Sequence, residues 1–136
     1  MKLMIVDDHA GVRKLIRQLV AASDDIVCEC ASGDEAVPLA RDFHPDCVTM
    51  DVRMAGLDGI KTTRVLRASH PAVRIVVVTA FDQPDLRRAA AAAGAAGYVL
   101  KENLTELLAV LLTGGGEVTS SAATATAVGP QPEGRN

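Results

Sequence analysis

Five short apolar runs alternate with five helical patterns along residues 1–112, and this alternation constrains the fold more than any other feature of the chain. The apolar runs lie at 3–6, 26–28, 47–50, 73–78 and 98–100. Residues 75–78 are all β-branched, which favours a strand over a helix. Helical patterns follow at 12–20, from 32 onward, and at 60–69, 85–93 and 104–111. Five strand–helix repeats predict an α/β fold, in which helices cover both faces of a parallel sheet.

The second helical pattern contains one residue that conflicts with it. Residues 32–35, Ser-Gly-Asp-Glu, have the form of a capping box that opens a helix. Pro38 then falls near the second turn, where it lacks an N–H donor and its ring clashes with the carbonyl of Asp34. We therefore expect this helix to start late or to bend at Pro38.

Residues 113–136 differ in composition from the rest of the chain. They are mostly small or polar, and Val118 and Val128 are their only larger apolar residues. Such a segment cannot bury enough surface to offset its ordering entropy. We expect one domain at 1–112 and a flexible tail or truncated linker at 113–136, because 136 residues leave no room for a second well-packed domain.

Charge and hydropathy argue against several classes of protein. A net charge of −3 and a pI near 5.5 lack the basic footprint of an autonomous nucleic-acid binder. No apolar run approaches the roughly 18 residues that span a bilayer. Asp7 and Asp8 come too early for a signal peptide. The expectation is a cytoplasmic protein that itself binds neither membrane nor nucleic acid.

Polar residues stand where four of the five expected strands end. They are Asp7, Asp8, Asp51, Thr79 and Lys101. The carboxyl ends of parallel strands form the ligand crevice of an open sheet, so these side chains should meet there. Taken singly, each has an ordinary explanation as a cap, a strand residue or solvated surface.

Together, these side chains favour phosphoryl chemistry. Three carboxylates at one edge repel, and a cation is needed to keep them all ionised. Mg²⁺ fits because it binds one or two carboxylates together with waters and phosphate oxygens. Lys101 and Thr79 add a positive charge and a hydroxyl, which suit a transfer that depends on positioning and charge neutralisation. An aspartate can itself be the nucleophile and form an acyl phosphate.

Four motifs also resemble the CheY-like receiver domains of two-component response regulators. They are Ile5-Val6-Asp7-Asp8-His9, Met50-Asp51-Val52-Arg53-Met54-Ala55-Gly56-Leu57-Asp58-Gly59, Val78-Thr79-Ala80 and Gly97-Tyr98-Val99-Leu100-Lys101. The resemblance runs from residue 2 to about 112, in the family's order and spacing. The first and last motifs are most similar to the NarL/FixJ subgroup, whose members usually carry a DNA-binding output domain. The fold implied is flavodoxin-like, (βα)5, with strand order 2-1-3-4-5.

The resemblance implies a role for each acidic residue. Asp51 would accept a phosphoryl group from the phosphohistidine of a sensor histidine kinase. Asp8, Asp51 and the backbone carbonyl of Arg53 would ligate Mg²⁺, with Asp7 acting nearby. The chain would then catalyse only its own phosphorylation and dephosphorylation.

The remaining motif residues would sense the phosphoryl group. Thr79 would hydrogen-bond its oxygens, and Lys101 would pair with the aspartate or its phosphate. Tyr98 matches the family's switch aromatic, although strand packing explains it equally well. The family's output face, made of the fourth helix, fifth strand and fifth helix, is the expected homodimer surface, and the alanine run at 89–93 would anchor its fourth helix weakly.

Three positions depart from the family's pattern. Ala55 stands where proline is usual, so the loop after the phosphoacceptor would be less rigid. Glu102 stands where many members have proline, which leaves the geometry of the Lys101–Glu102 peptide open. Arg53 lies beside the phosphorylation site, where a bulky cation would alter water access, so Arg53→Asn should change the dephosphorylation rate.

Three cysteines, Cys28, Cys30 and Cys47, are an odd number without zinc-ligand spacing, which favours small buried side chains. The implied strand order places the first strand between Cys47 and the other two. Two strand spacings are about 9.5 Å, beyond the roughly 7 Å reach of a disulfide. We expect no disulfide.

Other functions compete with a phosphorylated receiver. A phosphatase of the haloacid-dehalogenase type also uses an aspartate nucleophile, a lysine and Mg²⁺, but it needs a second aspartate where this chain has Arg53. A receiver-like module that binds partners without being phosphorylated is the second alternative. A DNA-binding regulator is a third, and it requires that this chain be a fragment with its output domain elsewhere.

Overall fold

The computed structural model describes residues 1–54, 56 and 58–113. Its five strands form one parallel sheet in the order β2-β1-β3-β4-β5. The strands are β1 (Lys2–Val6), β2 (Ile26–Cys30), β3 (Cys47–Met50), β4 (Arg74–Thr79) and β5 (Gly97–Leu100). The helices are α1 (Ala10–Val20), α2 (Gly33–Phe43), α3 (Gly59–Ser69), α4 (Pro84–Ala93), the 3₁₀ helix η1 (Lys101–Glu106) and α5 (Leu107–Thr113). The predicted fold class and strand order are confirmed.

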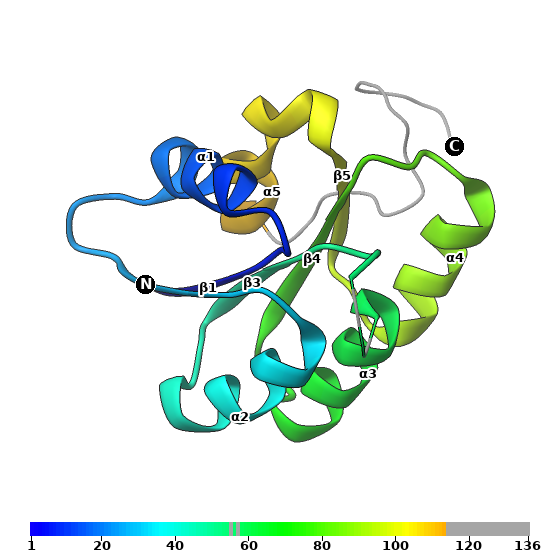
Figure 1. Cartoon of the computed structure of the whole chain (residues 1–136), viewed down its shortest axis with the longest axis horizontal. Helices are drawn as coiled ribbons and strands as arrows, with labels where there is room; N and C mark the ends of the chain where they lie inside the picture. Colours follow the sequence, from blue (N-terminus) through cyan, green and yellow to red (C-terminus); the bar gives the residue numbers. More distant parts are fainter. Residues whose placement is uncertain (55, 57, 114–136) are drawn as a thin grey trace.

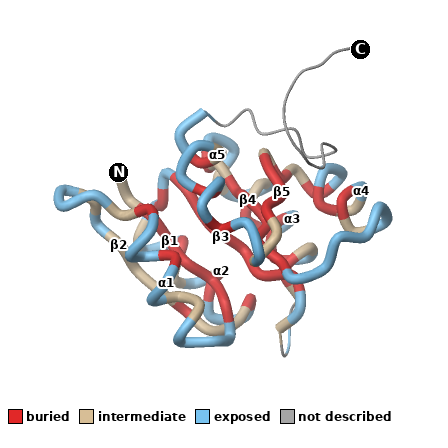
Figure 2. The backbone as a smooth tube through the Cα atoms, turned by 90° about the horizontal axis from the view of Figure 1, so that it is seen from above, coloured by how far each residue is buried: buried red, intermediate tan, exposed pale blue. Residues whose placement is uncertain are grey.

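Helices cover both faces of the sheet, α1 and α5 on one side and α2, α3 and α4 on the other (Figure 1). Alternate residues of β1 feed the two cores: Leu3 and Ile5 pack with α1 and α5, and Met4 and Val6 pack with α2 and α3. Burial on both faces explains the unbroken apolar runs of the sequence. Figure 2 shows β1, β3 and β4 buried inside a more exposed shell of helices and loops. Within the described ranges, no helix is long and apolar enough to cross a membrane.

Of the two outcomes expected at Pro38, a late start or a bend, the late start is wrong. Helix α2 begins at Gly33 and runs without interruption to Phe43, and the Ser32 hydroxyl accepts a hydrogen bond from the Glu35 N–H as the capping box predicts. Pro38 and Asp34 both lie on the exposed side of the helix. Pro38 has no N–H to donate to the Asp34 carbonyl, and water can reach the helix on this exposed side.

Two smaller expectations are resolved by the backbone. Cys28, Cys30 and Cys47 are free thiols, since β1 lies between β2 and β3 as expected. No peptide bond among the described residues is cis, so the Lys101–Glu102 bond is trans. A glutamate at this position gives a secondary amide, for which the trans form is strongly preferred.

Candidate functional site

The ends of β1, β3 and β5 bring Asp7, Asp51 and Lys101 together. The Lys101 ammonium lies 2.9 Å from Asp7 Oδ2 and 3.4 Å from Asp51 Oδ1. The Asp7 N–H donates to the Cys30 carbonyl and the Asp51 N–H to the Val6 carbonyl, so strand-like hydrogen bonding continues into both aspartates. These backbone bonds fix the two carboxylates at the edge of the sheet. Three of the residues predicted from strand ends therefore meet.

Both aspartates are almost completely buried, Asp7 with 1% and Asp51 with 5% of its surface exposed. Burial, together with the charge of Asp7, raises the pKa of Asp51 to about 6, although Lys101 opposes this shift. Burial alone would lower the pKa of Lys101, but the carboxylates of Asp7 and Asp51 outweigh it and raise that pKa. At neutral pH the site therefore holds a mostly ionised Asp51 carboxylate beside a firmly protonated lysine.

The acidic edge fits a hard divalent cation. Asp7, Asp8 and His9 bring ligand atoms within 4.8 Å of one another. Asp7 Oδ2 is buried and pairs with the Lys101 ammonium, whereas the neighbouring Asp8 carboxylate is exposed and open to a cation. Mg²⁺ prefers carboxylate and carbonyl oxygens, so the aspartates suit it better than the imidazole does.

His9 was not singled out as a site residue by the sequence, yet it borders this edge. Its Nδ1 lies 2.8 Å from Asp8 Oδ1, and its backbone N–H donates to Asp7 Oδ1 at 2.9 Å. The imidazole is largely exposed, whereas the backbone bond is partly buried. His9 thus helps to orient the two aspartates. Its position directly after the Asp-Asp pair was the only signal in the sequence.

Thr79 ends β4, one strand from Asp51, and is fully buried. Its hydroxyl oxygen accepts a hydrogen bond from the Phe81 N–H at 3.3 Å. Because that bond uses the hydroxyl as an acceptor, the hydroxyl proton is left for donation. Thr79 is therefore chemically suited to donate to an oxygen in the crevice.

Tyr98 on β5 is 7% exposed and lies beside the same loop. Its hydroxyl donates to the Phe81 carbonyl at 2.5 Å. The Arg87 guanidinium covers its ring, 4.6 Å from the centroid. Strand packing and a switch role both agree with a buried ring, so these contacts do not choose between them.

The loop after Asp51 depends on a glycine that the sequence did not mark as functional. Gly59 begins α3, and its N–H donates to the Val52 carbonyl at 2.9 Å. A Cβ at Gly59 would overlap the backbone carbonyl of Asp51. Gly59 thus allows the close approach of α3 to the backbone of Asp51. Ala55, the predicted departure in this loop, lies outside the described residues.

Arg53, two residues after Asp51, is exposed and places its guanidinium 4.2 Å from the centroid of the Phe81 ring. It also lines a pocket of about 550 Å³ beside Asp8 and the start of α3. The position of its backbone carbonyl as a metal ligand stays a prediction. The side chain instead joins the β3 and β4 loops across the crevice.

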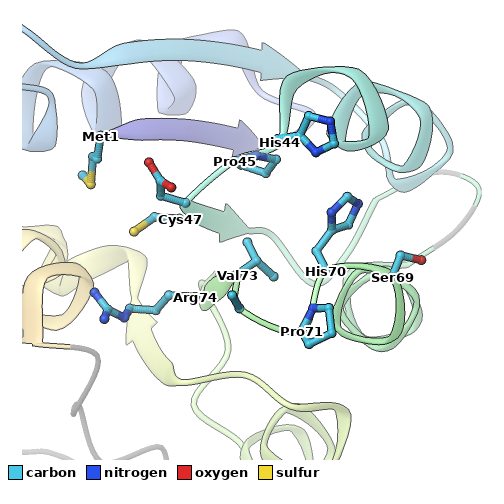
Figure 3. A pocket seen from close by; sticks show the side chains of 11 residues that line it. Met1, His44, Pro45, Cys47, Ser69, His70, Pro71, Val73 and Arg74 are labelled. Carbon is cyan, nitrogen blue, oxygen red and sulfur yellow. The ribbon is translucent and has the colours of Figure 1, made fainter.

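A second pocket, of about 570 Å³, lies at the opposite edge of the sheet (Figure 3). His44, Pro45 and His70 form part of its lining, and the Arg74 guanidinium at its rim donates to the Leu111 carbonyl. None of the predicted site residues lines it. The predicted site residues therefore belong to the other edge.

The response regulator receiver domain family matches this chain over residues 3–112. Response regulator GacA from Pseudomonas syringae is 39% identical over 102 residues, covering 74% of this chain and 48% of that protein. A nitrate/nitrite response regulator protein homolog from Haemophilus influenzae is 34% identical over 110 residues, covering 79% and 53% respectively. The chain thus spans about half the length of these relatives.

A solved structure agrees with both sequence relatives. The crystal structure of a two-component response regulator of the LuxR family from Aurantimonas sp. SI85-9A1 is similar at a TM-score of 0.76 with 36% identity, covering 82% of each chain. The family's match extends over the whole β1–α5 fold and includes every residue of the site. The chain therefore belongs to the response regulator receiver domain family, as a receiver of the two-component type.

Proposed function

We propose that Asp51 is the phosphoacceptor of this receiver and that a sensor histidine kinase is its donor. The observation that carries this proposal is the contact of a buried Asp51 carboxylate with Lys101, 3.4 Å away, beside the acidic edge of Asp7 and Asp8. A nucleophile, a fixed cation and a metal-binding edge are the parts that phosphoryl transfer needs.

Mg²⁺ is the proposed cofactor. Asp8, Asp51 and the backbone carbonyl of Arg53 would hold it, with Asp7 nearby. When bound, the ion neutralises charge on the phosphoryl oxygens. The close approach of the buried Asp7 and exposed Asp8 carboxylates supports a cation at this edge.

In the transfer, an Asp51 carboxylate oxygen attacks the phosphorus of the kinase's phosphohistidine. The new P–O bond forms as the P–N bond breaks, and the imidazole leaves with that electron pair. Lys101 stays protonated and pairs with the developing negative charge, and Thr79 donates its hydroxyl proton to a phosphoryl oxygen. In dephosphorylation, water attacks the phosphorus as the bond between phosphorus and the Asp51 oxygen breaks. The Asp51 carboxylate leaves with that electron pair and inorganic phosphate is released, so the chain acts only on its own aspartate.

The output of this switch is proposed to be the surface formed by α4, β5 and α5, with Thr79 and Tyr98 as its switch residues. We propose that two copies of the chain form a homodimer through that surface. The proposed location of the protein is the cytoplasm. DNA would be reached only through an output domain in a longer regulator of transcription. The LuxR-family structure, and a relative of which the match covers only 48%, support that arrangement. The predicted tail or linker at 113–136 lies outside the described residues.

Intact mass measurement after incubation with Mg²⁺ and acetyl phosphate tests the proposal. The native chain should gain one phosphoryl group, and it should gain none when Mg²⁺ is removed by chelation. Asp51→Asn should also gain none, whereas Asp24→Asn, which changes an exposed loop aspartate, should behave as the native chain. A folded native chain without an adduct would contradict the proposal and support a binding module that is not phosphorylated.

A further inference from the structure

An arginine on α4 is buried where its neighbours are alanines. The buried residues of α4 are Arg87, Ala90 and Ala93, so Arg87 has the largest of their side chains. Arg87 is only 9% exposed. Arginine is rarely buried unless its charge is paired or stacked. The attachment of α4 to the sheet therefore depends on what this guanidinium contacts.

The Arg87 guanidinium makes two different kinds of contact at once. Its Nε donates to Asp82 Oδ1 at 2.8 Å, and its plane covers the Tyr98 ring at 4.6 Å from the centroid. A planar guanidinium can donate at its edge and stack on its face together, which a lysine ammonium cannot do. Arg87 thus connects the loop before α4 to the aromatic side chain of β5.

The far end of Tyr98 returns to the same loop. Its hydroxyl donates to the Phe81 carbonyl, and the Phe81 N–H donates to the Thr79 hydroxyl oxygen. The contacts therefore form a continuous chain from α4 to the end of β4. It runs through Asp82, Arg87, Tyr98 and Phe81. If Tyr98 leaves its buried position, Arg87 loses its stacking partner and Phe81 loses its hydrogen bond.

We propose that Arg87 is a positioning residue that holds Tyr98 buried and thereby ties α4 to the loop that carries Thr79. The position of Tyr98 then depends on contacts with α4 as well as on the phosphoryl site. The regulatory consequence rests on the proposed function: a movement of Thr79 on phosphorylation would alter the α4 surface through this chain of contacts. The positioning itself is independent of phosphorylation.

The chain offers its own reporter, because Tyr98 is its single tyrosine. Incorporation of 3-fluorotyrosine gives one ¹⁹F signal for each environment of Tyr98, and the shift between H₂O and D₂O measures its exposure. In Arg87→Met, the ratio of buried to exposed signal should fall by about tenfold, since a buried cation–π contact contributes on this scale. Arg88→Met is the matched control, because Arg88 is the next residue on α4, is exposed and pairs with Asp85.

A second variant guards against loss of folding. Asp82→Asn changes an exposed side chain and removes only the charge that orients Arg87, so it should shift the signal in the same direction but less. A thermal melt of each variant establishes that it is folded. A buried, unchanged signal in folded Arg87→Met and Asp82→Asn would overturn the inference. Because no phosphoryl group is used, this result differs from a failure of Asp51 to be phosphorylated.

Discussion

The buried charge of Asp51 predicts that the native site lowers the stability of its own fold. Asp51 is 5% exposed, and burial with the nearby Asp7 charge raises its pKa to about 6, compared with 3.8 for an ordinary aspartate. The folded chain therefore binds this proton more tightly than the unfolded chain does. Protonated Asp51 therefore contributes stability that is fully present below about pH 4 and is lost as the pH rises through about 6.

The size of this effect follows from the two pKa values. Ionising a carboxyl whose pKa lies at about 6 instead of 3.8 costs the folded state about 3 kcal/mol at neutral pH. Asparagine has nearly the same shape and no charge. The stability gained on replacing Asp51 with asparagine is smaller than this cost, because Lys101 loses the carboxylate that lies 3.4 Å from it. We expect Asp51→Asn to raise the free energy of unfolding by about 1–3 kcal/mol at pH 7.5 in metal-free buffer.

Urea unfolding followed by circular dichroism, with EDTA present, measures this free energy. The native chain and Asp51→Asn should differ most at about pH 7.5, nearly as much at about pH 6, and much less toward about pH 4. Asp24→Asn, the exposed aspartate variant, should match the native chain at every pH. An Asp51→Asn protein that is no more stable at pH 7.5, or whose advantage grows toward acid, would refute the reasoning.

Three further substitutions test other parts of the account. Arg53→Asn removes the guanidinium that stacks on Phe81 beside the site and should shorten the lifetime of the phosphorylated chain by about threefold or more, a barrier change of about 0.7 kcal/mol; equal lifetimes in a phosphate-release assay would exclude this role. Gly59→Ala places a methyl group against the Asp51 carbonyl and should lower the free energy of unfolding, measured in urea, by about 1–3 kcal/mol; an unchanged free energy would mean that α3 moves away without cost. Thr49→Val replaces a buried hydroxyl without a hydrogen-bond partner and should raise the melting temperature, with a gain of about 1 kcal/mol. A lower melting temperature for this variant would mean that the hydroxyl is satisfied in solution.

The sequence predicted the sheet because burial on both faces leaves a pattern that does not depend on distant contacts. The runs at β1, β3 and β4 are mainly apolar, and each lies between two layers of helices. The meeting of Asp7, Asp51 and Lys101 followed from topology, since strands that run in parallel end at one edge. The late start expected at Pro38 was wrong because capping at Ser32 and solvent on the exposed side outweigh one lost hydrogen bond.

The residues that the sequence did not reveal act through contacts between elements. Gly59 looked like any helix-opening glycine until α3 was seen against the Asp51 carbonyl. In the sequence, Arg87 stands next to Arg88 and looks like part of a solvated helix face. Its burial is explained by its contact with Tyr98 in the folded chain. Charge and periodicity do not carry this information, because both arginines fit an amphipathic helix equally well.

Locating the phosphoryl group within the chain tests the central claim most directly. After phosphorylation with Mg²⁺ and acetyl phosphate, borohydride reduces an aspartyl phosphate to homoserine, and peptide mass spectrometry identifies the position that changed. The account predicts homoserine at position 51 alone, and only in samples that contained Mg²⁺. Homoserine at position 7 or 8, or a phosphoryl group carried by a histidine, would contradict it.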